Sequence, residues 1–237
     1  MIVDYCHLSE AGPRARNEDS LGVWLESPNA QMAAIADGLG GLHGGAAASQ
    51  LAISEIERLI NVGDLPSNDL HGIFNGLHEE IIRAQALSAE NRAMATTLSF
   101  IQVENGILRG AHVGDTRVMI ARKNGIKRLT QDQTEAWRLL QAGLIDRADY
   151  RTYPRKNVLY SALGAHRGIE VQEFSFEILS GDFIILTSDG IHQLLSMSEF
   201  RDISRMSLTC AEFVGYVRRE IERRMPSDNF SIIVMKA

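Results

Sequence analysis

Hydrophobic and polar positions along the chain change pattern twice. Short runs typical of β-strands open the sequence, two stretches with apolar residues every three or four positions follow, and strand-like runs then return. The predicted strands comprise residues 2–8, 21–26, 32–36, 96–103, 107–113, 117–122, 126–129, 169–176, 182–187 and 230–235. The Asn124-Gly125 pair predicts the hairpin turn that leads into the run at 126–129.

Amphipathic helices are predicted where apolar residues fall on one face. The first face comprises Ala48, Leu51, Ala52, Ile56, Leu59 and Ile60, and the second comprises Leu70, Ile73, Phe74, Leu77, Ile81 and Ala84. A third, near the C-terminus, comprises Cys210, Phe213, Val214, Val217 and Ile221. Strands, paired helices and then strands again predict an α+β fold: a central β-sandwich of two mainly antiparallel sheets flanked by pairs of helices, in α-β-β-α layers.

The segment from about 131 to 165 is less regular than the rest, with a short helical stretch at 137–142 between polar loops. It is expected to form a surface excursion. No repeat, low-complexity tract or linker marks a boundary elsewhere, so residues 1–237 are predicted to form a single domain.

Composition narrows the class of protein. Apolar residues make up 45% and charged residues 23% of the chain, which is ordinary for a folded globular protein. A formal charge of -6 without a long basic run argues against a nucleic-acid partner. Two cysteines, the absence of a signal-like N-terminus and the absence of a long apolar window predict a cytoplasmic protein without a membrane segment.

Aspartates recur beside Gly or Asn at predicted strand ends. The five are Asp19, Asp37, Asp115, Asp189 and Asp228. Any one of them is explained by turn chemistry, in which Asp bonds the backbone and Gly adopts positive φ. Five together favour a site for a hard divalent cation, because Mg²⁺ and Mn²⁺ take oxygen ligands supplied by several strands.

A candidate phosphate-binding group lies close to the first aspartate in the sequence. Arg14 lies five residues before Asp19, and its guanidinium offers a planar fork that grips two phosphate oxygens. The alternative for Arg14 is a surface ion pair. The glycine-rich run after Asp37, ahead of a helix expected to begin near Gly45, can approach an anion but fits neither a P-loop nor a dinucleotide fingerprint.

Taken in order, these segments resemble the type 2C protein phosphatases, the metal-dependent serine/threonine phosphatase family. The similarity spans nearly the whole chain and rests on Gly12-Pro13-Arg14-Ala15-Arg16-Asn17-Glu18-Asp19, Ala36-Asp37-Gly38-Leu39-Gly40-Gly41, Met94-Ala95-Thr96-Thr97-Leu98, Gly114-Asp115-Thr116-Arg117, Leu129-Thr130-Gln131-Asp132, Gly181-Asp182, Thr187-Ser188-Asp189-Gly190 and Ser227-Asp228-Asn229. The combination and order of the blocks make the signal specific.

The resemblance implies a role for each matching residue. The ligands of two Mn²⁺ or Mg²⁺ ions would be Asp19, Asp37, Asp189 and Asp228 with the carbonyl of Gly38. Asp115, assisted by Asp189, would hold a third and weaker ion, and Arg14 would clamp the phosphate of the substrate. The excursion at about 131–165 matches the flap beside the family's active site, where selectivity for protein substrates is expected.

The implied activity is hydrolysis of phosphoserine and phosphothreonine in proteins by direct attack of a metal-bridging hydroxide, with Asp37 and Asp189 central to the catalysis. No phosphoenzyme is needed, and no persuasive Cys or Ser nucleophile motif is present. The expected partners are phosphorylated proteins and a bacterial serine/threonine kinase pathway that this enzyme opposes. The protein is expected to be a free-standing monomer.

The sequence departs from the family at one end of the site. Leu39 stands where some members carry a general-acid His, and Leu42 and Ala46 stand where bacterial members have His and Glu. His43 is given no role. The other histidines considered, His112, His166 and His192, are predicted to be structural, as are Thr96 and Thr97.

Two rival functions are compatible with the same fold. One is a catalytically silent regulator that binds phosphoproteins, which the complete set of carboxylates disfavours. Phosphopeptide release with Mn²⁺ and with a chelator separates it from an enzyme. The other is a phosphatase of small phosphoesters, which a comparison of a phosphoprotein with free nucleotides distinguishes.

Overall fold

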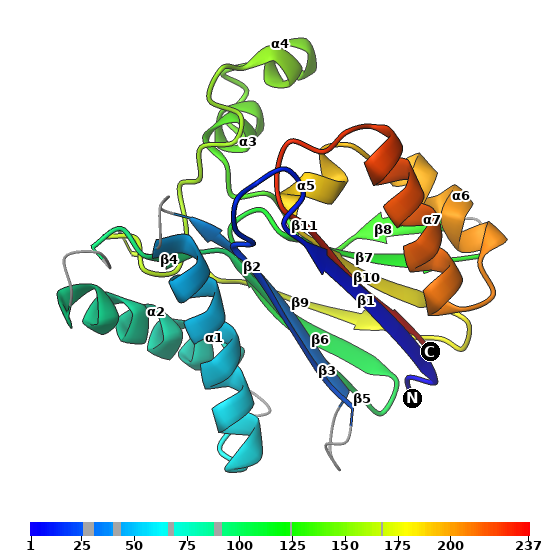
Figure 1. Cartoon of the computed structure of the whole chain (residues 1–237), viewed down its shortest axis with the longest axis horizontal. Helices are drawn as coiled ribbons and strands as arrows, with labels where there is room; N and C mark the ends of the chain where they lie inside the picture. The colour runs from blue at the N-terminus through cyan, green and yellow to red at the C-terminus, as the bar shows by residue number, and fades with distance from the viewer. Residues whose placement is uncertain (26–30, 40–43, 66–68, 88–91, 124, 167) are drawn as a thin grey trace.

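Two antiparallel sheets stack face to face in the computed structural model, which describes residues 1–25, 31–39, 44–65, 69–87, 92–123, 125–166 and 168–237 (Figure 1). One sheet has the order β1 (Asp4–Glu10), β11 (Phe230–Lys236), β10 (Phe183–Thr187), β7 (Arg117–Arg122) and β8 (Gly125–Arg128). The other has the order β2 (Asp19–Trp24), β3 (Gln31–Leu39), β5 (Leu98–Glu104), β6 (Ile107–Val113) and β9 (Gln172–Glu177), with β4 (Ala95–Thr96) paired to β3.

Helices cover the outer face of each sheet. Helices α1 (Gly44–Asn61) and α2 (Leu70–Leu87) pack on the sheet that contains β3, through buried Ile56, Phe74 and Ile81. Helices α6 (Met197–Met206) and α7 (Cys210–Arg223) pack on the other sheet, through Phe200 and Phe213.

Between the sheets, a third apolar cluster unites the two inner faces and includes Ile35, Ile101, Ile184 and Ile233. Burial of apolar area on three levels therefore stabilises the layers. The predicted α-β-β-α sandwich is confirmed.

The structure contains helices that the sequence pattern did not single out: α4 (Arg147–Thr152), α5 (Asp189–His192) and α6. Helices α4 and α5 are too short to show an apolar period, whereas α6 places the buried Phe200 and Ile203 three residues apart on one face. Side-chain caps define the starts of α4 and α6: the Asp146 carboxylate accepts the amide hydrogens at the start of α4, and Ser196 with Glu199 forms a capping box on α6. Capping residues were a signal for α4 and α6, and the apolar period was a further one for α6.

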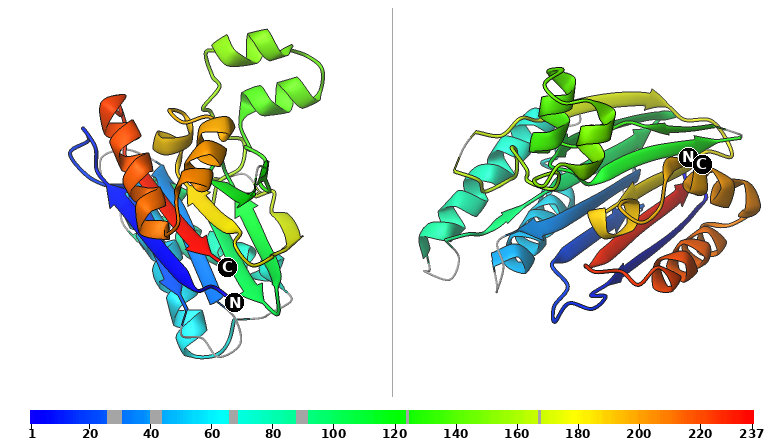
Figure 2. Two further views of the ribbon diagram at one scale, coloured as in Figure 1. Left: turned by 90° about the vertical axis from the view of Figure 1, so that its right-hand side faces the viewer. Right: turned by 90° about the horizontal axis from the view of Figure 1, so that it is seen from above.

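The segment from about 131 to 165 carries α3 (Glu135–Gln141) and α4, which project away from the sheets (Figures 1 and 2). Its two ends are joined at the base. The Glu135 amide donates to the Val158 carbonyl at 2.7 Å, and the Tyr160 amide donates to the Gln133 carbonyl at 2.9 Å. The excursion is thus clamped at its root like a hairpin.

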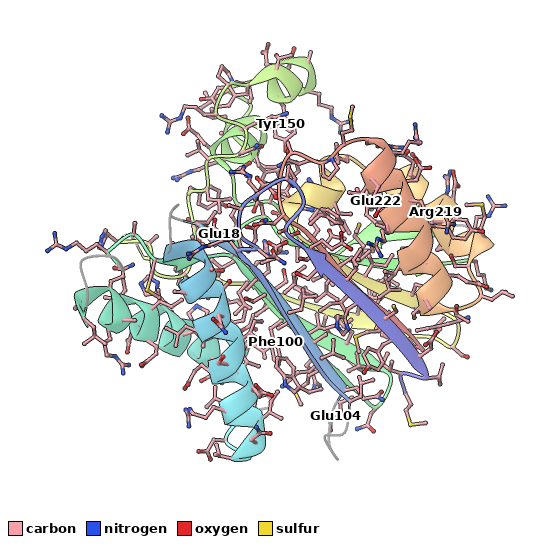
Figure 3. The ribbon with its side chains drawn as sticks, in the orientation of Figure 1. Glu18, Phe100, Glu104, Tyr150, Arg219 and Glu222 are labelled. Atoms are coloured by element: carbon pink, nitrogen blue, oxygen red, sulfur yellow. The ribbon has the colours of Figure 1, made fainter. Side chains whose placement is uncertain are left out.

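The loops that carry the predicted site residues gather at one end of the sandwich. Glu18 and Tyr150 lie towards that end and Glu104 towards the other (Figure 3). Gly40, Gly41, Leu42, His43 and Asn124 lie outside the described residues. None of the helices described is both long and apolar enough to span a bilayer.

Candidate active site

Asp19 and Asp37 stand directly opposite each other, because the antiparallel register of β2 and β3 pairs them. Asp19 is buried, and its Oδ2 accepts a hydrogen bond from the Ser188 hydroxyl at 2.8 Å. Its Oδ1 is buried without a hydrogen-bond partner among the described residues. A buried carboxylate oxygen without a partner is costly, so this position is suited to a ligand that completes it.

The backbone around Asp37 is fixed by the strand beneath it. The Asp37 amide donates to Thr97 Oγ1 at 2.9 Å, and Thr96 Oγ1 donates to the Asp37 carbonyl at 3.0 Å. The Thr97 amide donates to the same carbonyl at 2.9 Å. These bonds confirm the structural role predicted for the two threonines.

Glycine is required after two of the aspartates because backbone segments approach closely there. A Cβ on Gly38 would lie 2.2 Å from the Gly45 carbonyl oxygen at the start of α1, and one on Gly190 would lie 2.0 Å from the Asn229 carbonyl oxygen. Neither neighbour is a flexible side chain, so no other residue fits without movement of the main chain. The glycines therefore set how near the aspartates come to one another.

Asp189 and Asp115 reach the same region from the ends of other strands. Asp189 follows β10 at the start of α5, and its Oδ2 accepts a hydrogen bond from Gln193 Nε2 at 2.8 Å. Asp115 is buried in the turn between β6 and β7, directly after Gly114, whose φ of 108° is unfavourable for other residues. Asp115 thus comes from a turn at a strand end, as predicted, whereas Asp189 is the first residue of α5 and Asp37 lies within β3 rather than in a turn after residue 36.

Electrostatics shows that these carboxyl groups form one cluster. Burial raises the pKa of Asp19 to about 6, and the charges of Asp189 and Asp228 add to the rise. Hydrogen bonds to Asp19 lower its pKa, but by less than burial raises it. Burial followed by the charges of Asp19, Asp189 and Asp115 raises the pKa of Asp37 well above its usual value. The pKa of Asp115 is also raised well above its usual value, by burial and then by Asp189.

Asp37 and Asp189 lie close enough for each to shift the pKa of the other. Burial and then Asp228 raise the pKa of Asp189. Two carboxylates in contact repel unless a proton or a cation lies between them. The pair therefore has a high affinity for positive charge.

Arg14 and Asp228 lie at the exposed edge of this cluster. The Arg14 guanidinium forms an ion pair with Asp228 at 2.7 Å and also donates from Nε to the Ser227 carbonyl at 3.2 Å. The side chains of Arg14 and Asp228 are 57% and 40% exposed, so the guanidinium can exchange partners at little cost. The structure brings the predicted phosphate clamp to the site, where it contacts a predicted metal ligand.

The residues fit a hard divalent cation in chemistry and in charge. Every predicted ligand offers oxygen, one buried oxygen lacks a partner within the described part of the chain, and the cluster holds several acidic groups with Arg14 at its edge. As their side chains stand, no three acidic, histidine or cysteine residues in the described ranges are grouped closely enough to hold an ion together. The ligand roles of Asp19, Asp37, Gly38, Asp115, Asp189 and Asp228 therefore stay predictions.

Comparison with known proteins decides the family. Residues 9–223 match the family model described as Protein phosphatase 2C. The chain belongs to this family. It is similar to the serine/threonine phosphatase stp of Listeria monocytogenes serotype 4b (strain F2365), with 26% identity over 230 residues that cover 94% of this chain and 91% of that one. Membership confirms the predicted resemblance and favours an enzyme over the silent regulator.

Solved structures of phosphatase 2C proteins have the same fold. The S. agalactiae serine/threonine phosphatase superposes on this chain with a TM-score of 0.91 at 21% identity, and the match covers 99% of each chain. The catalytic domain of the serine/threonine protein phosphatase PstP, solved in complex with 2 manganese ions, has a TM-score of 0.83 at 26% identity and covers 99% of this chain and 98% of its own. Dependence on a divalent metal follows for the family.

Three polar residues that support this phosphatase 2C site were quoted in the motifs but given no role. Asn229 receives the Glu18 amide on its Oδ1 and donates from Nδ2 to the carbonyls of Ala11 and Arg16. Ser188 connects Asp19 to the Ser231 amide, and Asn17 Oδ1 accepts the Asp19 amide. Their positions directly beside predicted ligands were the available signal.

Two of the histidines predicted to be structural, His112 and His192, have partners of that kind, whereas His166 is exposed and its role stays a prediction. His112 is fully buried, accepts at Nδ1 from Ser99 Oγ at 2.9 Å, and donates from Nε2 to the Gly114 carbonyl at 2.9 Å. Burial lowers its pKa to about 4, so the ring is neutral. His192 is buried and contacts Thr187 Oγ1 at 3.2 Å.

Proposed function

We propose that this phosphatase 2C protein removes phosphate from phosphoserine and phosphothreonine in other proteins and opposes a serine/threonine kinase. The observation that carries the proposal is the cluster of raised-pKa carboxyl groups around Asp19 and Asp37, with a buried oxygen that lacks a partner and an arginine at its exposed edge. The acidic groups would bind cations and the guanidinium would bind the anionic ester, so metal binding and substrate binding would occur at the same site.

The residues that would hold two Mn²⁺ or Mg²⁺ ions are Asp19, Asp37, Asp189 and Asp228 with the Gly38 carbonyl, and Asp115 with Asp189 would hold a third, weaker ion. Bound divalent cations would supply Lewis acidity, which activates water as the nucleophile and stabilises charge on the phosphoryl oxygens. The raised pKa values of these aspartates support the assignment, because coordination keeps the carboxylates ionised at neutral pH.

The chain's own residues would then position the ester. Arg14 would leave Asp228 for the phosphate, since both are exposed and a phosphate offers two oxygens to the fork. Ser188 keeps Asp19 oriented by its hydrogen bond at 2.8 Å, and Thr97 keeps Asp37 in register. Preorganised groups of this kind lower the barrier because they need not reorient during the reaction.

Protonation of the leaving alkoxide needs a source other than the side chain after the Asp-Gly pair, since Leu39 carries no acid. Asp115 keeps its proton readily because burial and Asp189 raise its pKa well above its usual value. Asp115 cannot bind a metal ion and donate a proton at the same time, so in the fully loaded enzyme the proton would come from water or from another residue.

Release of phosphate from a phosphothreonine peptide tests this function. The protein should turn over the peptide with Mn²⁺ and should lose that turnover when a chelator is added, with recovery on excess Mn²⁺. Free nucleotides should be poor substrates by comparison. Equal rates with and without chelator would remove the metal-dependent mechanism. We further propose that the protein acts as a monomer in the cytoplasm, and sedimentation of the purified chain tests the first part.

A further inference from the structure

Asp19 is held by hydrogen bonds at both its carboxyl group and its amide. On the carboxyl side, Asp19 Oδ2 accepts from the Ser188 hydroxyl at 2.8 Å, and Ser188 Oγ accepts in turn from the Ser231 amide at 2.9 Å. The Ser188 amide also donates to the Ser231 carbonyl at 3.0 Å, so Ser188 is bonded twice to β11. The carboxyl side of Asp19 is therefore fixed to a strand inside the sheet.

On the amide side, the bonds pass through Asn17 to Ser9 on β1. Asn17 Oδ1 accepts from the Asp19 amide at 3.1 Å, which leaves Asn17 Nδ2 as the donor to Ser9 Oγ at 2.7 Å. Ser9 Oγ also accepts from the Ser231 hydroxyl at 2.8 Å. Ser231 thus belongs to both sides, and the bonds form a closed ring through Asp19, Ser188, Ser231, Ser9 and Asn17.

The register of two strands brings the ring together. Ser9 of β1 stands opposite Ser231 of β11, and the two strands lie side by side (Figure 1). Ser231 is fully buried, whereas Ser9 is exposed on a strand at the edge of its sheet. An exposed serine therefore links a buried hydroxyl to the loop between β1 and β2.

The same bonds close the base of the loop that carries Arg14. Ser9 and Asn17 come before and after Arg14 in the chain, and their side chains meet at 2.7 Å. Within the loop, the Arg14 amide donates to the Ala11 carbonyl at 3.2 Å. The predicted metal ligand at position 19 and the predicted phosphate clamp are thus held by one set of hydrogen bonds.

We propose that Ser9 is a positioning residue of the active site, which fixes Asp19 for metal binding and Arg14 for phosphate binding as the link between Ser231 and Asn17. The inference rests on the proposed function and extends it to a residue that is not itself a predicted ligand of metal or phosphate. Partners that orient metal ligands raise metal affinity, because the ligands need not reorient on binding. An exposed hydroxyl contributes little to folding, so its loss affects binding more than stability.

The test compares Ser9→Ala with the original chain. Calorimetric titration gives Kd for Mn²⁺, turnover of a phosphothreonine peptide at saturating Mn²⁺ gives KM and kcat, and urea unfolding with chelator gives stability. Ser9→Ala should raise both Kd and KM by roughly three- to tenfold, as for loss of one hydrogen bond beside a metal ligand. Its kcat should change less, and its urea midpoint with chelator should stay the same.

Two further variants assign the effect to the hydroxyl. Ser9→Thr keeps the hydroxyl on a strand, where a β-branched residue is well tolerated, and should restore most of the affinity for Mn²⁺ and peptide. Ser175→Ala is the matched control, because Ser175 is another exposed serine on an edge strand, β9, and has no side-chain hydrogen bond among the described residues. It should leave Kd and KM unchanged.

Asn17→Ala tests the route, since it opens the ring at the next residue. If Ser9 acts through Asn17, the double variant Ser9→Ala/Asn17→Ala should bind Mn²⁺ as well as Asn17→Ala alone, because the bond between the two side chains is already lost. Additive losses of affinity would mean that Ser9 does not act through Asn17.

The positioning role is wrong if Ser9→Ala leaves Kd or KM unchanged, or if Ser9→Thr is as impaired as Ser9→Ala. A fall of the urea midpoint with chelator in step with the losses of affinity would make Ser9 structural and would overturn the role as well. An original chain that binds no Mn²⁺ would instead contradict the proposed function itself, and the positioning role with it.

Discussion

Two sets of buried carboxyl groups lie side by side at one end of the sandwich, and their pKa values are shifted in opposite directions. Asp132 has two arginines of its own, Arg117 and Arg128, and its pKa is lowered despite burial. Asp19 and Asp37 have hydroxyl, amide and carboxyl neighbours instead, and their pKa values are raised. Asp115 faces both groups, with Arg117 opposing the rise that burial causes.

The difference separates a structural ion pair from a ligand site. A buried carboxylate that the chain neutralises with its own arginines is complete on folding, and its charge is available for nothing else. Carboxylates that the chain leaves without a cation weaken the fold until a cation arrives from solution. In this protein the first group ties β7 and β8 to the start of the segment at about 131–165, and the second is the candidate metal centre.

The largest effect is expected for Asp37→Asn or Asp189→Asn. Either change should reduce phosphate release from a phosphothreonine peptide by a factor of about 10³ or more. Each removes a negative charge that is needed to bind the metal ions and so to activate water. In the presence of chelator, the same change should leave the free energy of unfolding unchanged or raise it, since like-charge repulsion falls. Urea unfolding with chelator measures the second quantity.

Asp64→Asn is the control for that change, because Asp64 is an exposed aspartate just after α1. It should keep full activity. Full turnover by Asp37→Asn or Asp189→Asn would contradict the ligand assignment, whereas loss of both activity and stability would indicate misfolding.

The next largest effect is expected for Asp132→Asn. It leaves Arg117 and Arg128 close together without their shared carboxylate, so the free energy of unfolding should fall by roughly 3 kcal/mol. The sign is opposite to that expected for Asp37→Asn in chelator. Asp202→Asn, which removes an exposed ion pair with Arg201, should change little and serves as the control in the same urea titration.

The pH dependence of stability should differ with and without metal. Because the folded-state pKa of Asp19 is raised from 3.8 to about 6, the folded chain holds an extra proton between these values, and stability with chelator should fall as pH rises through that window. The loss is on the order of 3 kcal/mol for one such group. With saturating Mn²⁺ this fall should be absent, because bound metal keeps the carboxylate deprotonated in the folded chain, as it is in the unfolded chain above its ordinary pKa.

The effect is measured as the urea midpoint at about pH 4.5, 5.5 and 6.5, with and without Mn²⁺. These pH values span the window in which Asp19 titrates in the folded chain. Parallel pH dependence in the two series would mean that Asp19 and its neighbours do not bind the metal.

The smallest effect is expected for Arg14→Ala. Loss of the guanidinium should raise KM for a phosphopeptide roughly tenfold with a smaller change in kcat, since Arg14 is more than half exposed and solvent screens its contacts. Arg14→Lys should restore part of the affinity, because it keeps the charge but loses the fork. An unchanged KM together with a lower melting temperature would make Arg14 structural, a partner of Asp228 only.

The amount that could be predicted differs between fold and site. The strand at 107–113 and the one at 117–122 have the predicted bounds, because continuous apolar runs between turn residues are unambiguous. Helices α4 and α5, of six and four residues, were missed because they have no period to detect. For the site, the five aspartates were found from their motifs, but the bonds of Ser188 and Asn229 were not, since they join segments far apart in the chain.

The amino-acid sequence by itself determined the layers of the fold, the identity of the five acidic residues, and the resemblance to phosphatase 2C, because apolar period and short motifs are local. Only the tertiary structure decided which carboxylates are neutralised. Arg117, Arg128 and Asp132 are close in sequence, yet nothing local shows that both arginines serve one carboxylate. Nor does it show that Asp19 keeps an oxygen without a partner. Burial and charge pairing depend on distances between segments, and these exist only once the sheets have stacked.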